Sequence, residues 1–277
     1  MVSKIEMKNI NKIIKEINEN LENLGRSVIA KEISKSKHKL FNLYREAFFL
    51  EIDTPTQHQM KWHQWGIVTH TRKFVEMYDH EVQKDVKQWG ISKMVERKLS
   101  EEIDGIAKGK LLYLAILLHD IGKFQKSYTE HSNLKVTFSF KDHEQYSQQI
   151  IENEFYPLLH DHYGLTKQQI NYIGICARYH FELGFVREEA KKSEYGYSLE
   201  FVHSKLFHEL ISTRIGTFKE YAVEVGLLFL GDSYAKTEIK SLKELEGKKL
   251  ERLSFTVQQK EVNIEVARAY FDYLVKP

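Results

Sequence analysis

The sequence predicts an all-α fold, and three observations support this prediction. Only 3 of the 277 residues are proline, and the helix-favouring residues Leu, Ile, Lys and Glu are abundant. Apolar residues recur at helical spacing in several segments, beginning with Ile10, Ile13 and Ile17. Residues 111–118 (LLYLAILL) form a nearly continuous apolar run, which is typical of a buried helix. We therefore expect a helical bundle organised around this run, with helical extensions at both ends.

The N-terminal part is expected to form two helices before any residue that carries chemistry. The first would cover about residues 4–24 and end at Gly25, and the second would cover about 27–51. Either a partner surface or plain packing support would explain them, and packing support is the simpler interpretation. After a break near Pro55, a helix over about 65–80 places His70 on its apolar face, four residues before Phe74.

Composition limits the classes of function. The formal charge of +2 gives no global field of the kind that marks a nucleic-acid-binding protein, so nucleic acid is possible as a partner but is not indicated by charge. The single cysteine, Cys176, excludes an internal disulfide and a thiolate zinc site. The sequence contains no apolar run of ~18 residues and no apolar core of a signal peptide near its start. We expect a cytoplasmic protein without a membrane span.

The apolar run ends in His119-Asp120-Ile121-Gly122-Lys123. A histidine and a carboxylate at the end of a core helix are costly to desolvate unless they have a partner. A divalent cation is one such partner, because imidazole nitrogen and carboxylate oxygen are both metal ligands. We expect Gly122 to let the backbone turn out of the helix and Lys123 to place a cation beside the metal. The alternative is a purely structural His-Asp pair.

Further candidate residues follow along the chain. Residues 81–108 look like an additional helical insertion, and Val136, Phe138 and Phe140 alternate like a short strand. A helix is expected to begin after Asp142 as its N-cap, with His143 in the first turn and Ser147 four residues later. A second His-Asp string, His160-Asp161-His162, lies in what we expect to be a polar loop, and we assign it no role.

The C-terminal half repeats the same features. A helix with Thr166 as N-cap would carry His180 on the face of Ile173 and Ala177. We expect a loop at 183–197, helices at about 198–213 and 217–235, and a final helix near 258–274. The apolar run 227–230 again leads to a carboxylate, Asp232, and Lys236 follows it by one helical turn.

The string HDIGK at 119–123 resembles the signature of the HD superfamily of metal-dependent phosphohydrolases. The phrase WHQWGIVTHT around His70 most resembles the HD domain of bacterial CCA-adding tRNA nucleotidyltransferases, here without a nucleotidyltransferase domain. The resemblance implies an HD domain at 55–240, with helical extensions at 1–54 and 241–277. It also implies a set of metal ligands in family order: His70, His119, Asp120, His143, His180 and Asp232.

The resemblance further implies hydrolysis of a phosphomonoester or phosphodiester by metal-activated water. Asp120 and Lys123 would take part in catalysis, and Lys123, Arg178 and Lys236 would bind the substrate. One or two ions of Mn, Fe, Co, Ni, Zn or Mg would fit the ligand types. The substrate is expected to be a small phosphorylated compound of nucleotide size, because aromatic residues flank the motifs: Tyr113, Phe124, Tyr179 and Phe181.

Two other functions remain open at this point. Some HD-fold proteins, such as myo-inositol oxygenase, use the same order of ligands to hold two irons and activate oxygen. A non-catalytic nucleotide sensor, in which metal only stabilises the fold, is a third possibility. A cyclic-dinucleotide phosphodiesterase of the HD-GYP type is disfavoured because the Gly-Tyr-Pro string is absent. The oligomeric state is left open.

Overall fold

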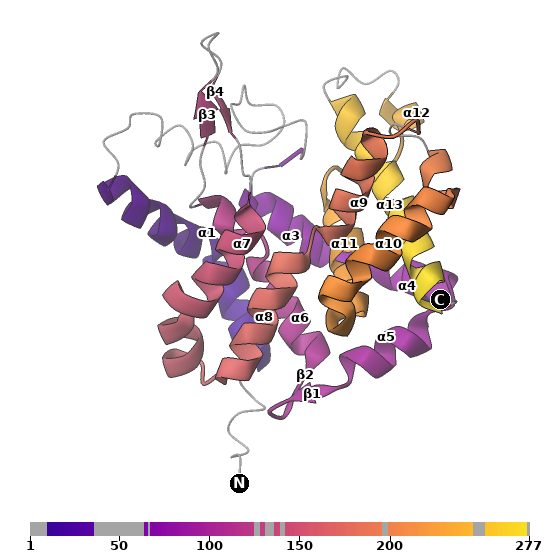
Figure 1. Cartoon of the computed structure of the whole chain (residues 1–277). Helices are drawn as coiled ribbons and strands as arrows, with labels where there is room; N and C mark the ends of the chain where they lie inside the picture. Colours follow the sequence, from indigo (N-terminus) through magenta and orange to yellow (C-terminus); the bar gives the residue numbers. More distant parts are fainter. Residues whose placement is uncertain are drawn as a thin grey trace. The chain divides into compact units, whose positions relative to one another are not determined.

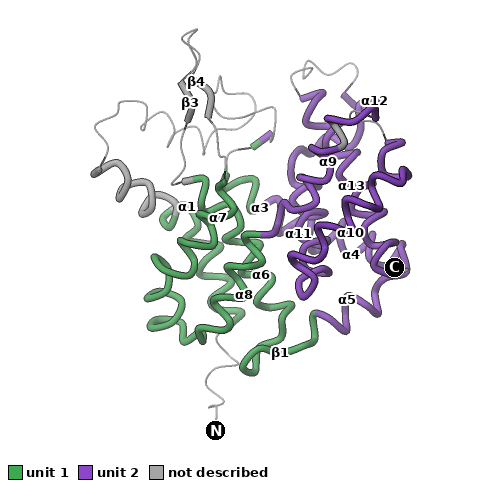
Figure 2. The backbone as a smooth tube through the Cα atoms, viewed as in Figure 1, with its two compact units in different colours: residues 1–60, 65–72, 99–178 green, residues 61–64, 73–98, 179–277 purple. Residues whose placement is uncertain are grey.

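Figure 1 shows a computed structural model of the chain, which describes residues 10–35, 64–65, 67–124, 128–130, 136–138, 142–195, 199–245 and 253–275. The described part is helical apart from two short hairpins, so the prediction of an all-α fold is confirmed. It divides into two compact units, coloured green and purple in Figure 2. The first unit contains the described residues within 1–60, 65–72 and 99–178, and the second unit contains those within 61–64, 73–98 and 179–277.

The first unit is built around α6 (Lys108–Leu118), the apolar run identified in the sequence. Seven of its residues are buried, because apolar side chains cover every face of the helix: Leu111, Leu112, Leu114, Ala115, Ile116, Leu117 and Leu118. The 3-10 turn η2 (Ile121–Phe124) follows it, and α1 (Ile10–Lys35) packs against both elements. The unit also contains the first turns of α3 (Ile67–Met77), α7 (His143–Gln149), η3 (Ile150–Glu154), η4 (Pro157–His162) and α8 (Lys167–Tyr179).

The expected end of the first helix at Gly25 is wrong, because α1 continues through Gly25 to Lys35. A glycine inside a helix costs only about 1 kcal/mol relative to alanine. No proline follows within this helix to interrupt the backbone hydrogen bonds. The remainder of the expected second helix, residues 36–51, lies outside the described residues.

The expected insertion at 81–108 is only partly helical. It contains the end of η1 (Tyr78–Val82), then α4 (Gln83–Gln88) and α5 (Ser92–Leu99), followed by a hairpin of β1 (Glu102–Ile103) and β2 (Ile106–Ala107). Asp104 and Gly105 form the two-residue turn, and both have positive φ angles, 49° and 83°. Asp-Gly dipeptides favour this turn type, so these two residues indicate a hairpin in the sequence, where a helical segment was expected.

A second hairpin pairs β3 (Tyr128–Glu130) with β4 (Val136–Phe138). β4 covers the first part of the strand that the alternating residues Val136, Phe138 and Phe140 predicted.

The two expected N-caps behave differently. Thr166 caps α8, because its Oγ accepts from the amide of Gln169 at 3.3 Å while Gln169 Oε1 accepts from the amide of Thr166 at 2.9 Å. This reciprocal pair is a capping box. Asp142 precedes α7 as expected, but its side chain does not cap the helix. Its backbone is left-handed, with φ of 63°, and this conformation differs from the extended one of a capping residue.

The second unit packs α11 (Ala222–Ala235) against α13 (Ser254–Val275) and α9 (Glu182–Lys191). The expectation of a loop at 183–197 is wrong, because α9 occupies most of it. Leu183, Val186 and Arg187 are buried, and their spacing of three and four residues places them on one helical face. The unit also contains η5 (Leu199–His203), α10 (Lys205–Phe218), η6 (Lys219–Tyr221) and α12 (Leu242–Leu245).

None of the described helices has both the length and the apolar character that crossing a bilayer requires. Both units bury polar groups, and in the second unit one of them is a lysine with a lowered pKa. Lys260 on α13 is buried, and its ammonium donates to the carbonyl oxygens of Thr237 at 2.8 Å and Ile239 at 3.1 Å. Burial lowers the pKa of Lys260 to about 8, although the carboxylates of Glu244 and Glu81 oppose this effect.

The low pKa of Lys260 makes stability depend on pH. The pKa is 10.5 for an unperturbed lysine and about 8 in the folded protein, so between these values the unfolded chain binds more protons. Stability therefore rises with pH across this window, by up to about 3 kcal/mol. We expect Lys260→Met to abolish this rise. Urea denaturation of both proteins across this pH range measures it, and parallel curves for the two proteins would contradict the assignment.

Candidate metal centre

The end of α6 presents two ionisable side chains inside the first unit. The helix ends at Leu118, His119 and Asp120 follow, and η2 then begins at Ile121. His119 is 0 % exposed and Asp120 is 1 % exposed, since the apolar faces of α6 lead the backbone into the core before these residues are reached. A carboxylate at this depth is stable only with positively charged or hydrogen-bonding neighbours.

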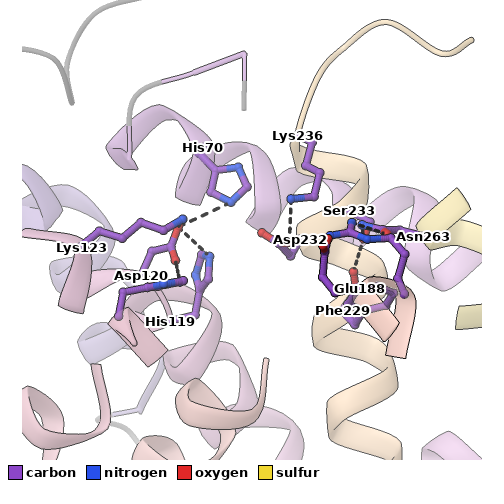
Figure 3. A network of polar contacts seen from close by, with 12 residues as sticks. His70, His119, Asp120, Lys123, Glu188, Phe229, Asp232, Ser233, Lys236 and Asn263 are labelled. Carbon is purple, nitrogen blue, oxygen red and sulfur yellow. Dashed lines mark hydrogen bonds and ion pairs between the residues drawn. The ribbon is translucent and has the colours of Figure 1, made fainter. Parts of the chain in front are cut away.

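Three such neighbours lie close to one oxygen of Asp120, Oδ2 (Figure 3). Lys123 Nζ lies 2.6 Å from Asp120 Oδ2, His119 Nε2 lies 3.3 Å from it, and His70 Nε2 lies 3.8 Å from it. His70 reaches this point from the first turn of α3. One donor atom from each of His70, His119 and Asp120 falls within 4.8 Å of the others, so these three side chains could hold a metal ion.

The other oxygen of Asp120 faces a different imidazole. His143, at the start of α7, places its Nε2 3.2 Å from Asp120 Oδ1. Its second ring nitrogen, Nδ1, lies 3.3 Å from Glu144 Oε2. A carboxylate on the second ring nitrogen fixes the orientation of a histidine and raises its basicity as a ligand. The two oxygens of Asp120 thus face separate sets of imidazoles.

The protonation of His119 follows from its backbone contact. Nδ1 lies 2.8 Å from the carbonyl oxygen of Ile116, one turn earlier in α6. A carbonyl oxygen only accepts, so Nδ1 donates its proton there. Loss of the proton from Nε2 would leave a lone pair on this atom facing Asp120, which is the tautomer that a metal-ligating histidine needs.

The charge of Asp120 is set by the same neighbours. Burial would raise the pKa of its carboxyl group, but the charges of His119 and Lys123 and the hydrogen bonds from His119 and His143 outweigh burial. The pKa of Asp120 consequently lies well below its ordinary value, and the group is ionised at neutral pH. An ionised, buried carboxylate between imidazoles is suited to bind a cation.

Gly122 has a different role from the one expected. Its backbone does not adopt a left-handed conformation; it is a glycine because α7 lies directly on it. A Cβ at this position would overlap the His143 carbonyl oxygen and approach the Ser147 amide nitrogen to 2.6 Å. The Gly122 amide donates to Ser147 Oγ at 2.9 Å. The glycine therefore allows α7 to bring His143 to Asp120.

The remaining predicted ligands belong to the second unit. His180 follows α8 and is buried, and Asp232 is buried on α11. Lys236 Nζ lies 3.5 Å from Asp232 Oδ2 (Figure 3). The same atom lies 5.4 Å from the centre of the Phe181 ring. The proximity of His180 and Asp232 to Asp120 stays a prediction.

The structure also describes the surroundings of Lys123, Arg178 and the second His-Asp string. Lys123 is buried, and its ammonium donates to the carboxylate of Asp120. Arg178 is exposed on α8, and its guanidinium donates to Gln148 Oε1 at 3.3 Å. The second His-Asp string lies in η4 instead of the expected loop, where His160 Nδ1 donates to the Leu165 carbonyl at 2.7 Å. That bond gives His160 a structural contact.

A family model described as the HD domain matches residues 63–195. This match supports the HD superfamily of metal-dependent phosphohydrolases, and it covers His70, His119, Asp120, His143 and His180. Asp232 lies outside the matched range, so its assignment depends on its buried position after an apolar run. No curated protein sequence matches the chain. The finer resemblance to CCA-adding enzymes is not confirmed.

We expect Gly122→Ala to separate α7 from the turn after α6. Overpacking of this kind costs about 1–3 kcal/mol and displaces His143. Gly216→Ala on α10 is the matched control, because a Cβ there meets nothing within 4 Å and should leave stability unchanged or raise it. Thermal unfolding of both variants measures the difference, and equal midpoints would contradict the packing argument.

Proposed function

We propose that the chain is a metal-dependent phosphohydrolase that cleaves a phosphomonoester or phosphodiester of nucleotide size. One observation carries this proposal: the ionised carboxylate of Asp120 turns one oxygen toward His70 and His119 and the other toward His143. A carboxylate placed in this way can bridge two cations. The match to the HD family over the same residues supports the reaction class.

The donor set fits a divalent metal. Imidazole and carboxylate ligands suit Mn, Fe, Co, Ni or Zn, while several imidazoles argue against Mg alone. His70, His119 and Asp120 would hold one ion, and Asp120 with His143 would hold a second. We propose that His180 and Asp232 complete these sets. A bound ion would supply Lewis acidity and lower the pKa of a bound water.

The side chains around Asp120 prepare the site for an anionic substrate. Ile116 and Glu144 orient the rings of His119 and His143 through their Nδ1 atoms. Lys123 keeps a fixed positive charge on the carboxylate, and we propose that this charge also stabilises negative charge developing on the phosphoryl oxygens. Lys236 and Arg178 are proposed as further contacts to the substrate. The small net charge favours a low-molecular-weight phosphoester over nucleic acid.

The reaction class can be tested by anaerobic turnover. We expect protein loaded with Mn²⁺ to release phosphate or a phosphomonoester from a panel of nucleotides and cyclic nucleotides without oxygen. His119→Ala should abolish turnover, whereas His162→Ala, at an exposed histidine of the second His-Asp string, should retain it. Activity that requires iron and oxygen, with no ester hydrolysed, would instead support an HD-fold oxygenase.

The number of metal ions can be tested separately. We expect elemental analysis to find about two ions per chain in the wild type and about one in His143→Ala. The control is His208→Ala, because His208 is exposed on α10. A single ion that His143→Ala leaves in place would contradict the bridging role of Asp120.

Lys123 can be tested by removing its charge. We expect Lys123→Ala to lower kcat by about 10²–10³, the usual cost of losing one group that stabilises transition-state charge. Lys73→Ala removes an exposed ion pair with Glu76 and should leave kcat unchanged. Steady-state kinetics on the best ester of the panel measures both. A change in KM alone would indicate that Lys123 contributes only to ground-state binding.

A further inference from the structure

A buried chain of polar side chains crosses the second unit. Arg187 on α9, Ser233 on α11 and Asn263 on α13 are all buried, and Arg187 is 1 % exposed. The three helices that carry them are far apart in the sequence. We name this group the Arg187–Asn263–Ser233 relay.

The hydrogen bonds of the relay have a single consistent direction. Arg187 donates through one guanidinium nitrogen to Asn263 Oδ1 at 2.9 Å. Asn263 Nδ2 donates to Ser233 Oγ at 3.0 Å, and Ser233 Oγ donates to the Phe229 carbonyl at 2.6 Å. Each acceptor in the chain is also a donor to the next group, so the Asn263 amide is held in one orientation. Figure 3 shows the contact between Ser233 and Asn263.

Both ends of the relay lie next to a proposed metal ligand. Ser233 directly follows Asp232 on α11. The Arg187 guanidinium lies 5.5 Å from the centre of the Phe181 ring, and Phe181 directly follows His180. Phe181 also lies 5.9 Å from Phe229, whose carbonyl ends the relay. The contacts therefore connect the residue after His180 with the residue after Asp232.

The energetics favour a positional role over a purely stabilising one. Burying a guanidinium is costly even with a partner such as Glu188, whose Oε1 lies 2.6 Å from the Arg187 guanidinium, and apolar residues of similar volume are often as good or better for stability. Apolar packing tolerates shifts of α11 against α13, whereas a directed chain of hydrogen bonds does not. On the other flank of Asp232, a Cβ at Gly231 would approach Phe74 Cδ2 to 2.8 Å, so α11 is also held closely from this side.

We propose that Arg187, Asn263 and Ser233 are positioning residues that hold Asp232 and His180 in the geometry required for metal binding. This inference rests on the proposed function, because it requires Asp232 and His180 to be ligands. The three residues touch neither metal nor substrate and act through their neighbours in the chain. Disturbing the relay should therefore change the metal site before it changes the fold.

The test is titration of the metal-free protein with Co²⁺, followed by the visible absorption of the bound ion. The relay variants are Ser233→Ala and Asn263→Asp, the second of which keeps the acceptor for Arg187 but removes the donor to Ser233. The matched control is Tyr270→Phe, because the Tyr270 hydroxyl also links α13 to α11, at the Ala222 carbonyl 2.8 Å away. Asp232→Ala is the reference for loss of a ligand.

We expect both relay variants to weaken Co²⁺ affinity about 10-fold and to alter its absorption spectrum, as removal of supporting contacts does at metal sites. Tyr270→Phe should lower the thermal midpoint but leave affinity and spectrum unchanged. Relay variants that match Tyr270→Phe in affinity and spectrum, or that do not fold while Tyr270→Phe does, would overturn the proposal. If Asp232→Ala itself binds Co²⁺ like the wild type, the ligand assignment fails, and the relay proposal falls with it.

Discussion

The structure of the first unit depends on keeping one buried carboxylate ionised. Asp120 lies at the end of α6, where burial alone would raise its pKa and make it a poor ligand. Lys123, His119 and His143 reverse this effect, and each must approach from a different element. Lys123 comes from the turn η2, and His143 comes from α7, which docks only because residue 122 is a glycine. The electrostatic requirement of one side chain is therefore met by contacts that η2 and α7 make at the end of α6.

The second unit also buries a carboxylate, and the neighbours described for it differ from those of Asp120. Asp232 is again buried after an apolar run, and again a lysine follows it at 3.5 Å. Within the second unit, this lysine, Lys236, also lies over the Phe181 ring, and a chain of hydrogen bonds that begins at Arg187 reaches Ser233, the residue after Asp232. The ammonium of Lys236 lies near both Asp232 and Phe181. The ammonium of Lys236 thus offsets the charge of Asp232, and the relay bonds to Ser233, the next residue of α11.

Lys123 shows how one residue can serve both stability and chemistry. Its ammonium lies on the oxygen of Asp120 that faces His70 and His119. In this position it offsets the cost of burying the carboxylate and concentrates positive charge where an anionic group would be bound. A lysine is suited to this double role because its charge is compact and its stem is flexible. The position also explains why the lysine is buried rather than exposed.

The sequence by itself determined the features that depend on local periodicity and local chemistry. The apolar runs predicted α6 and α11 and placed Asp120 and Asp232 at buried positions, and Thr166 marked the start of α8. Tertiary structure decided the features that depend on contact between distant segments. Gly122 is required by α7, which begins 21 residues later at His143. Helix α9 forms where charged residues had predicted a loop, because its buried face packs against α11 and α13. Helical spacing reports which face of one segment is apolar, but it does not report what that face will meet.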